Sequence, residues 1–88
     1  MSYVYILRSL VDGNLYIGST NDLRRRIKEH NSGKSFSTRF RKPFILVYYE
    51  AYLAEDDARR REQGLKTRGQ ALRQLRGRLS KTLAQDIS

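Results

Sequence analysis

The sequence predicts a small α+β domain, a three-stranded sheet flanked by helices in the order β-β-α-β-α-α, in which the first two strands are antiparallel and the direction of the third stays open. Two apolar, tyrosine-rich runs surround the turn pair Asp12-Gly13, and a third apolar run follows the only proline, Pro43. Stretches with the apolar spacing of amphipathic helices lie between and after these runs. The strands are expected at Tyr3–Leu7, Leu15–Thr20 and Phe44–Tyr52. With 88 residues and no linker rich in Pro or Ser, we expect residues 1–88 to form a single domain.

The first two strands are expected to form a hairpin, because Asp-Gly between apolar runs is a strong hairpin signal. Side chains alternate along a strand, so a loop with an even number of residues puts Tyr5 and Tyr16 on one face of the sheet. A two-residue turn at Asp12-Gly13 would leave the tyrosines roughly 13 Å apart. A wider loop, for example residues 9–14, would pair Tyr5 with Gly18 and bring the two tyrosines within reach of each other. A shared site for both tyrosines therefore requires the wider loop.

The stretch STNDLRRRIKEHNSG, which overlaps the end of the second strand, predicts an amphipathic helix. Ser19 or Asn21 can cap its N-terminus, and Gly33 can end it in a left-handed conformation. One face of this helix is expected to carry Leu23, Arg26, Ile27 and His30. The segment KSFSTRFRK, from Lys34 to Lys42, is then expected to form an exposed basic loop.

Two further helices are expected after the third strand. The stretch AEDDARRREQGLKTR begins with three acidic residues, which favour a helix N-terminus, and its inner face is expected to carry Ala58, Glu62 and Leu65. Gly64 costs this helix about 1 kcal/mol relative to alanine, so we expect a bend or an early end there. Residues 69–88 are expected to form one amphipathic helix that covers the core. Its apolar stripe consists of Leu72, Leu75, Leu79 and Leu83, and its outer face carries Arg73, Arg76, Arg78 and Lys81.

Charge and composition narrow the possible functions. The chain has 18 Lys and Arg against 9 Asp and Glu, a formal net charge of +9. Such a surplus attracts nucleic acid through counterion release, although solubility or attraction to an anionic membrane would also explain it. The absence of cysteine excludes disulfides, thiolate metal sites and a cysteine nucleophile. No apolar run approaches the ~20 residues that cross a bilayer, and no signal-peptide pattern is present, so we expect a cytoplasmic protein without a membrane partner.

Five polar residues are expected at inward-facing positions: Tyr5, Tyr16, Arg26, His30 and Glu62. Such residues need partners, because an unpaired buried charge costs several kcal/mol. One arrangement gathers all five in one cleft. In the alternative, the tyrosines only pack the sheet, Arg26 and Glu62 form an ordinary salt bridge, and His30 stabilises a helix C-terminus. Residue spacing alone leaves both arrangements open.

The order and spacing of these residues resemble a GIY-YIG nuclease domain, and in particular the small stand-alone bacterial proteins of that superfamily. The run YVY at residues 3–5 is similar to the first signature, with Tyr3 in place of its glycine, and YIG at residues 16–18 matches the second. The stretch STNDLRRRIKEHN matches the helix with the family's arginine, at Arg26, and its histidine-or-tyrosine position, at His30. The stretch RREQGLK matches the segment that bears the family's metal-binding glutamate, at Glu62. The resemblance extends from Tyr3 to about Leu65.

This resemblance implies a GIY-YIG-like fold, with a three-stranded antiparallel sheet flanked by helices. It also implies hydrolysis of a nucleic-acid phosphodiester with one divalent metal ion, Mg²⁺ or Mn²⁺. We expect no small-molecule cofactor. By the resemblance, Glu62 would hold the metal and Arg26 would stabilise charge on the phosphate. Tyr16 would take the nucleophile's proton, and Tyr5 and His30 would orient the reacting groups or relay that proton. Contacts to phosphates position a protein without reading bases. The expected protein is therefore an endonuclease that cuts DNA with low sequence specificity, in DNA repair or processing.

Nucleic-acid contacts are expected from Gly18, Lys34, Arg39, Arg41 and Lys42. Gly18 would let the backbone pass close to the substrate, and the four cations lie in the basic loop.

Two alternatives to a DNA endonuclease remain open. The first is a non-catalytic or weakly active nucleic-acid-binding module of the same fold. Many active members of the superfamily carry an asparagine after the glutamate-bearing helix, whereas the asparagines here are Asn14, Asn21 and Asn31. The second is an RNA-directed protein, in which Phe36 and Phe40 would stack on unpaired bases instead of anchoring the loop on the core.

Overall fold

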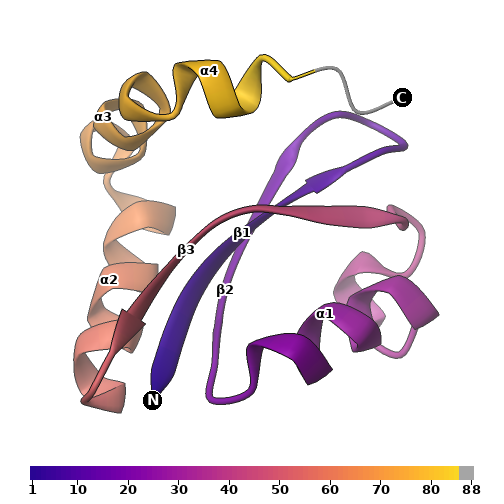
Figure 1. The fold of residues 1–88 in the computed structure, drawn as a ribbon, viewed down its shortest axis with the longest axis horizontal. Helices are drawn as coiled ribbons and strands as arrows, with labels where there is room; N and C mark the ends of the chain where they lie inside the picture. The colour runs from indigo at the N-terminus through magenta and orange to yellow at the C-terminus, as the bar shows by residue number, and fades with distance from the viewer. Residues whose placement is uncertain (86–88) are drawn as a thin grey trace.

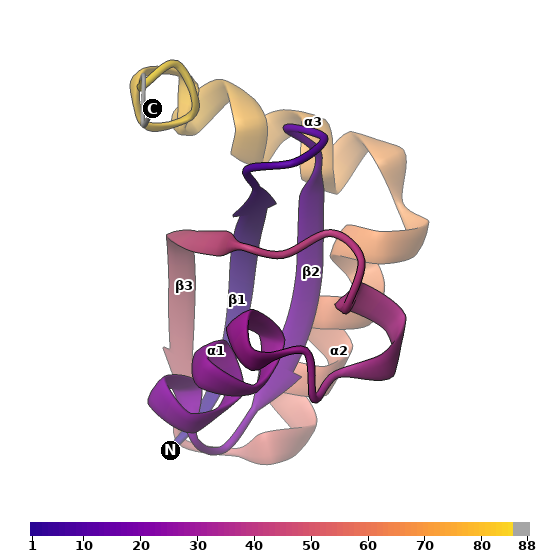
Figure 2. The ribbon, with the colours of Figure 1, turned by 90° about the vertical axis from the view of Figure 1, so that its right-hand side faces the viewer.

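Three antiparallel strands form the middle layer of the protein, which a computed structural model describes for residues 1–85 (Figure 1). The elements are β1 (Ser2–Ser9), β2 (Leu15–Thr20), α1 (Leu23–Ser32), the 3-10 helix η1 (Phe36–Thr38), β3 (Phe44–Tyr52), α2 (Glu55–Thr67), α3 (Gly69–Arg78) and α4 (Ser80–Leu83). The strand order is β2-β1-β3, and β1 runs antiparallel to both neighbours. Helix α1 covers one face of the sheet and α2 the other (Figure 2). The α+β fold predicted from the sequence is confirmed.

The hairpin has the wider loop that a shared tyrosine site requires. Tyr5 lies opposite Gly18 in the register of β1 and β2, and the last pair before the loop is Arg8 with Leu15. The Asp12-Gly13 pair lies inside the connection instead of forming a two-residue turn. The backbone N–H of Ser9 donates to the Asn14 carbonyl at 3.0 Å and closes the loop. The predicted pairing of Tyr5 with Gly18 is therefore confirmed.

Alternation along β1 divides the apolar core into two clusters. The cluster under α2 and α3 consists of Val4, Ile6, Ile17, Ala58, Leu65 and Leu75. The cluster under α1 consists of Tyr5, Leu7 and Phe44, with Tyr16, Leu23, Ile27 and Leu46 packed against it. Full burial of one large apolar side chain contributes about 1.5–3 kcal/mol, so both faces of the sheet are anchored. Tyr5 and Tyr16 belong to the same cluster, which places both under α1.

The N-cap of helix α1 is Asp22, one residue after Asn21 and three after Ser19, the two caps that the sequence suggests. The carboxylate of Asp22, and not a side chain of Ser19 or Asn21, accepts a hydrogen bond from the Arg25 backbone N–H at 3.1 Å. Ser19 remains part of β2 and bonds elsewhere. The helix ends at Gly33 as predicted, where φ is 83° and the backbone N–H donates to the Glu29 carbonyl.

The expected exposed loop after α1 is partly ordered into a 3-10 helix. Ser35 and Thr38 are buried at 6% and 0% exposure, so the segment docks on the protein through its hydroxyl side chains. The strand that follows begins at Phe44, after a cis Lys42–Pro43 peptide bond.

Helix α2 neither bends nor ends at Gly64, so the bend or early end expected there is wrong. The helix continues without interruption to Thr67. Ala58 lies near the start of the helix and Leu65 near its end. Both are 1% exposed and pack against the sheet. Tertiary packing of these two residues therefore outweighs the low helix propensity of Gly64.

The C-terminal helix is divided at Leu79, whereas the sequence predicts one continuous helix. Helix α3 ends at Arg78, Leu79 has φ −102° and ψ 18°, and α4 resumes at Ser80. The guanidinium of Arg8 donates to the Leu83 and Gln85 carbonyls at 2.5 and 2.8 Å, which fixes the end of α4 next to the hairpin. The predicted leucine stripe is confirmed in position, and the predicted residues 86–88 of this helix lie outside the described residues. Over residues 1–85, no helix combines the length and the apolar character that a bilayer span would need.

Candidate active site

A chain of buried hydrogen bonds crosses the interior under α1. The Tyr5 hydroxyl lies 2.9 Å from Nε2 of His30, and Nδ1 of His30 lies 2.7 Å from the Thr38 hydroxyl. Exposure is 1% for Tyr5 and 0% for both His30 and Thr38. These contacts join β1, the last turn of α1 and η1 into one unit. His30 therefore bonds to side chains of β1 and η1 from the last turn of α1, whereas in the alternative arrangement it only stabilises the helix C-terminus.

Burial perturbs both titratable groups of this chain. Burial raises the pKa of Tyr5 to about 12, and the nearby Arg26 guanidinium only partly opposes that change. Burial and the Arg26 charge together lower the pKa of His30 to about 4. Tyr5 is therefore a neutral hydroxyl and His30 a neutral imidazole at pH 7. Neither side chain is therefore suited to take a proton from water at pH 7, because Tyr5 keeps its own proton and His30 binds an extra one only weakly.

Tyr16 lies beside this chain with its side chain half-buried. Its ring centroid is 6.4 Å from that of Tyr5 and 5.0 Å from that of His30. The three aromatic rings thus form a single group, as the cleft arrangement predicts. Of the two tyrosines, Tyr16 is the one that reaches solvent.

Gly18 is required by the ring of Tyr5, which crosses directly over it. A Cβ atom at Gly18 would come within 2.4 Å of the Tyr5 hydroxyl oxygen and within 2.5 Å of Cζ. Real Cβ contacts are never this short, so any side chain at position 18 would displace Tyr5. The structure thus gives Gly18 a packing role, in addition to the substrate approach expected from the sequence.

Arg26 is held half-buried at the edge of the aromatic group. Its guanidinium donates to Glu29 at 3.0 Å and to the Ser35 hydroxyl at 3.3 Å, and its side chain is 30% exposed. Within residues 1–85, the acidic partner of Arg26 is Glu29 and not Glu62. The ordinary Arg26–Glu62 salt bridge of the alternative arrangement is therefore wrong. The guanidinium keeps part of its surface available to a ligand.

Glu62 approaches from the other side of the sheet, on α2, and contacts the edge strand β2. Its Oε1 accepts a hydrogen bond from the Ser19 hydroxyl at 2.6 Å, and its Oε2 pairs with the Lys66 ammonium at 2.6 Å. Burial alone would raise the pKa of Glu62, but the bonds from Lys66 and Ser19 outweigh it and hold that pKa below its usual value. The charge of Glu62 makes a small contribution to the raised pKa of Tyr5, after burial and the charges of Tyr16 and Arg26.

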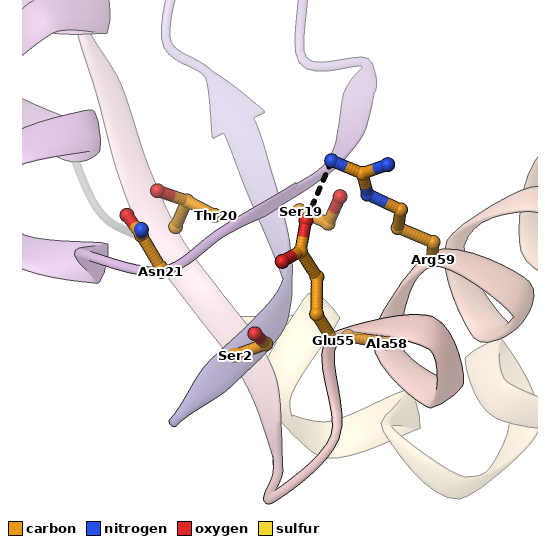
Figure 3. A pocket seen from close by; sticks show the side chains of 7 residues that line it. All are labelled: Ser2, Ser19, Thr20, Asn21, Glu55, Ala58 and Arg59. Atoms are coloured by element: carbon orange, nitrogen blue, oxygen red, sulfur yellow. Dashed lines mark ion pairs between the residues drawn. The ribbon is translucent and has the colours of Figure 1, made fainter.

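A polar pocket of about 220 Å³ borders the Glu62 contact, because Ser19 lines it. Figure 3 shows its walls: the end of β2 on one side and the first turns of α2 on the other. Within it, Arg59 pairs with Glu55 at 2.6 Å. Arg59 also helps to lower the pKa of Glu62. The carboxylate thus lies next to a hollow lined with hydroxyl, amide and charged groups.

The carboxylate of Glu62 suits a divalent metal ion, but the residues around it in the described part of the chain do not complete a set of protein ligands. Across residues 1–85, no group of three or more His, Cys, Asp or Glu residues could hold a metal by itself. Mg²⁺ and Mn²⁺ favour oxygen ligands, and Mg²⁺ often takes one or two carboxylates together with waters and substrate phosphates. An ionised, partly exposed Glu62 suits that mode of binding. Lys66 occupies Oε2 and would have to leave it.

The predicted nucleic-acid-binding cations divide into two kinds. Lys34 and Lys42 are exposed, and Arg39 contacts two phenylalanine rings. Arg41 instead pairs with Asp12 at 2.8 Å and helps to lower the pKa of Asp12 to about 2. The main contact of Arg41 is therefore with the hairpin loop, and its part-exposed guanidinium would bind a phosphate in competition with Asp12.

Sequence reasoning missed five polar partners of the site: Ser19, Glu29, Ser35, Thr38 and Lys66. Strand alternation could have found Ser19, since it lies on the same face as Ile17, which packs under α2. The spacing from Glu62 to Lys66 is an ordinary i, i+4 pair. Ser35 and Thr38 lie in an irregular segment, where no periodicity indicates direction.

Comparison with known proteins shows the family to which this chain is related. Residues 1–81 match the family model described as the GIY-YIG catalytic domain. The chain is 47% identical over 75 residues to a UPF0213 protein of Clostridium perfringens, a match that covers 82% of this chain and 80% of that protein. It is 44% identical over 66 residues to a UPF0213 protein of Bacillus pumilus, and there the match spans 74% of this chain and 66% of the relative.

A solved structure is also similar. The solution NMR structure of a UPF0213 protein from Bacillus halodurans superposes with a TM-score of 0.53 at 40% sequence identity. The match covers 96% of this chain and 95% of that one. The names of these relatives specify neither a substrate nor a metal.

Proposed function

This chain belongs to the GIY-YIG catalytic-domain family, and we propose that it is a divalent-metal-dependent endonuclease that hydrolyses DNA phosphodiester bonds. We propose further that it acts with low sequence specificity, in repair or processing of DNA. The family is one of nucleases, and the net charge of +9 suits a polyanionic substrate.

The observation that carries this proposal is the convergence of distant residues on one aromatic group. Tyr5, Tyr16 and His30 come from two strands and a helix, yet their ring centroids lie within 6.4 Å of one another. Arg26 borders the group, and its charge helps to lower the pKa of His30. Glu62 comes from α2 and bonds to Ser19 of the edge strand β2, which also carries Tyr16. Packing of the sheet alone does not require an arginine beside three polar rings.

Each residue has a role that its environment supports. Arg26 binds the phosphate, and its planar donors stabilise the negative charge that develops there during hydrolysis. Tyr5 stays protonated at pH 7 and donates or accepts one hydrogen bond as an orienting group, because its pKa is about 12. His30 fixes the position of Tyr5 as a neutral imidazole. Tyr16 is then the group left, in the role that the family resemblance gives it, to receive the proton of the attacking water.

Glu62 would hold the divalent metal through its carboxylate. The metal supplies Lewis-acid activation of the phosphate and of water. Ser19 orients the carboxylate through its hydrogen bond to Oε1, and Oε2 would become available to a metal when Lys66 leaves it. The polar pocket beside Ser19 gives the substrate backbone a place to approach this carboxylate.

The test is nicking of supercoiled plasmid DNA in Mg²⁺ or Mn²⁺ by the wild type, Glu62→Ala and Arg26→Ala. Two matched controls on the same helices are Asp56→Ala, which removes an exposed acid of α2, and Arg25→Ala, which removes the neighbouring cation of α1. We expect nicking by the wild type and both controls, and none by the two site variants. Absence of nicking in the wild type would favour the non-catalytic binding module, and unchanged nicking in both site variants would overturn the residue assignment.

A further inference from the structure

Two phenylalanines project from the surface beside the candidate active site. Phe36 is 77% exposed and Phe40 is 79% exposed. Neither ring anchors the segment to the core, so the anchoring role weighed for them from the sequence is wrong. Adjacent exposed apolar rings contribute nothing to folding and mark a surface that contacts something else.

Arg39 joins the two rings into one stack. Its guanidinium carbon lies 4.0 Å from the Phe36 ring centroid and 4.6 Å from that of Phe40. Cation–π contacts of this kind hold the rings in a defined orientation without covering them. At more than three-quarters exposure, each ring keeps open surface for a ligand. We call Phe36, Arg39 and Phe40 the aromatic platform.

The aromatic platform is fastened to the candidate active site at two points. The hydroxyl of Ser35 accepts a hydrogen bond from Arg26 at 3.3 Å, and the hydroxyl of Thr38 bonds to His30 at 2.7 Å. Consecutive Cα atoms are ~3.8 Å apart, so Phe36 begins one residue from a contact of the phosphate-binding arginine. A polynucleotide bound at Arg26 would therefore pass close to the platform.

The chemistry of the surrounding segment indicates which ligand the rings suit. Residues 34–42 carry four cations and no acidic residue. Basic surfaces with exposed aromatic rings bind single-stranded nucleic acid, because the cations follow the phosphates and the bases stack on the rings. Bases inside a duplex already stack on their neighbours and cannot offer a free face. A protein that docked on the two rings would not need cations around them.

We propose that the aromatic platform stacks an unpaired DNA base next to the scissile phosphate, which directs cleavage to DNA with a single-stranded portion. This inference rests on the proposed function for the phosphate site at Arg26. It adds a subsite and a substrate preference for unpaired over fully paired DNA.

The test uses tryptophan as a stacking probe, because the chain contains no tryptophan of its own. Phe36→Trp is titrated, in EDTA and therefore without catalysis, with a single-stranded DNA oligonucleotide, its duplex and the RNA of the same sequence. We expect quenching of tryptophan fluorescence by the single strand and little by the duplex. Leu53→Trp is the control, since Leu53 is 90% exposed and lies at the junction of β3 and α2, away from the platform.

Binding affinity provides the second arm. Each stacked base contributes about 1–3 kcal/mol, so Phe36→Leu/Phe40→Leu, which keeps apolar side chains and removes the rings, should lose roughly tenfold or more in affinity for single-stranded DNA. Affinity for the duplex should change by less than about twofold, because the cations remain. Equal loss on both DNAs, or no loss on either, would overturn the proposal, as would tighter ring-dependent binding of RNA. These experiments measure binding and not cleavage. A protein that binds as expected here but does not nick plasmid DNA would refute the proposed function and leave the platform supported.

Discussion

The hydroxyl of Tyr5 lies 2.9 Å from Nε2 of His30, and the two side chains are almost completely buried. This contact connects the central strand of the sheet to the last turn of α1. Thr38 extends it to the basic segment on the opposite side of the imidazole. The candidate site is therefore part of the core under α1, and its geometry and the stability of the fold depend on the same residues.

His30→Ala should lower the free energy of unfolding by about 3 kcal/mol. The change removes a buried ring and leaves the hydroxyls of Tyr5 and Thr38 without their partner. Urea denaturation followed by circular dichroism measures the effect. Thr38→Val, which removes one bond and keeps the shape, should cost about 1 kcal/mol and remains measurable if His30→Ala does not fold. A loss below about 0.5 kcal/mol in both variants would show that the chain of hydrogen bonds is not structural.

The protonation of His30 gives a direct prediction for pH. Its pKa is lowered from 6.5 to about 4, so the unfolded chain binds a proton between these values and the folded protein does not. Stability should therefore be constant above pH 6.5 and fall by roughly 2–3 kcal/mol as the pH decreases to about 4. His30 is the only histidine, so NMR can follow its imidazole without overlap. A titration midpoint near 6.5 in the folded protein would contradict the buried, neutral state.

Gly18→Ala should destabilise the protein by about 1–3 kcal/mol, because the new methyl group would overlap the Tyr5 ring. The double variant Gly18→Ala/Tyr5→Ala isolates this overlap in a double-mutant cycle. Once the ring is absent, the added methyl group should cost much less than it does in the wild type. Additive losses of stability would show that position 18 is restricted by something other than Tyr5.

Gly64→Ala should stabilise the protein by about 0.5–1 kcal/mol. A Cβ at position 64 meets no atom within 4 Å, and helix α2 already continues through this position. Alanine therefore gains helix propensity at no packing cost. Thermal and urea denaturation should both register the gain. A loss of stability would indicate that Gly64 has a conformation or contact that the structure does not show.

Lys66→Met should lower the Mn²⁺ concentration that gives half-maximal activity. The Lys66 ammonium pairs with the Glu62 oxygen that a metal would use. A partly exposed i, i+4 pair contributes about 0.3–0.5 kcal/mol, so the expected shift is roughly twofold. Arg60→Met serves as the control, since it removes another exposed cation of the same helix. An unchanged or higher metal requirement in Lys66→Met would argue against competition at Glu62.

The faces of the strands could be predicted from the sequence. Because side chains alternate with a period of two, any hairpin loop with an even number of residues places Tyr5 and Tyr16 on one face. The register stayed open between a two-residue turn and a wider loop. A site shared by both tyrosines required the wider loop, and the pairing of Tyr5 with Gly18 confirms that loop. Family resemblance then supplied the polar residues that converge near this pair.

Other features depended on contacts between distant parts of the chain. Gly64 does not interrupt α2, because the buried Leu65 beside it decides the local structure. The helix division at Leu79 accompanies the contact of Arg8 with the end of α4, which lies 75 residues away in the chain. Arg41 contacts Asp12 across 29 residues, so its pairing had no local signature.

The most direct test of the account is the rate of DNA cleavage by Glu62→Gln under single-turnover conditions, with excess protein and with DNA affinity measured in parallel. The substitution keeps the shape of the side chain and removes the charge that would hold the metal. We predict that the rate falls at least about 100-fold relative to the wild type, while the affinity for DNA changes by less than about threefold. An equal cleavage rate in wild type and Glu62→Gln would contradict the claim that Glu62 and the aromatic group bordered by Arg26 form one catalytic site.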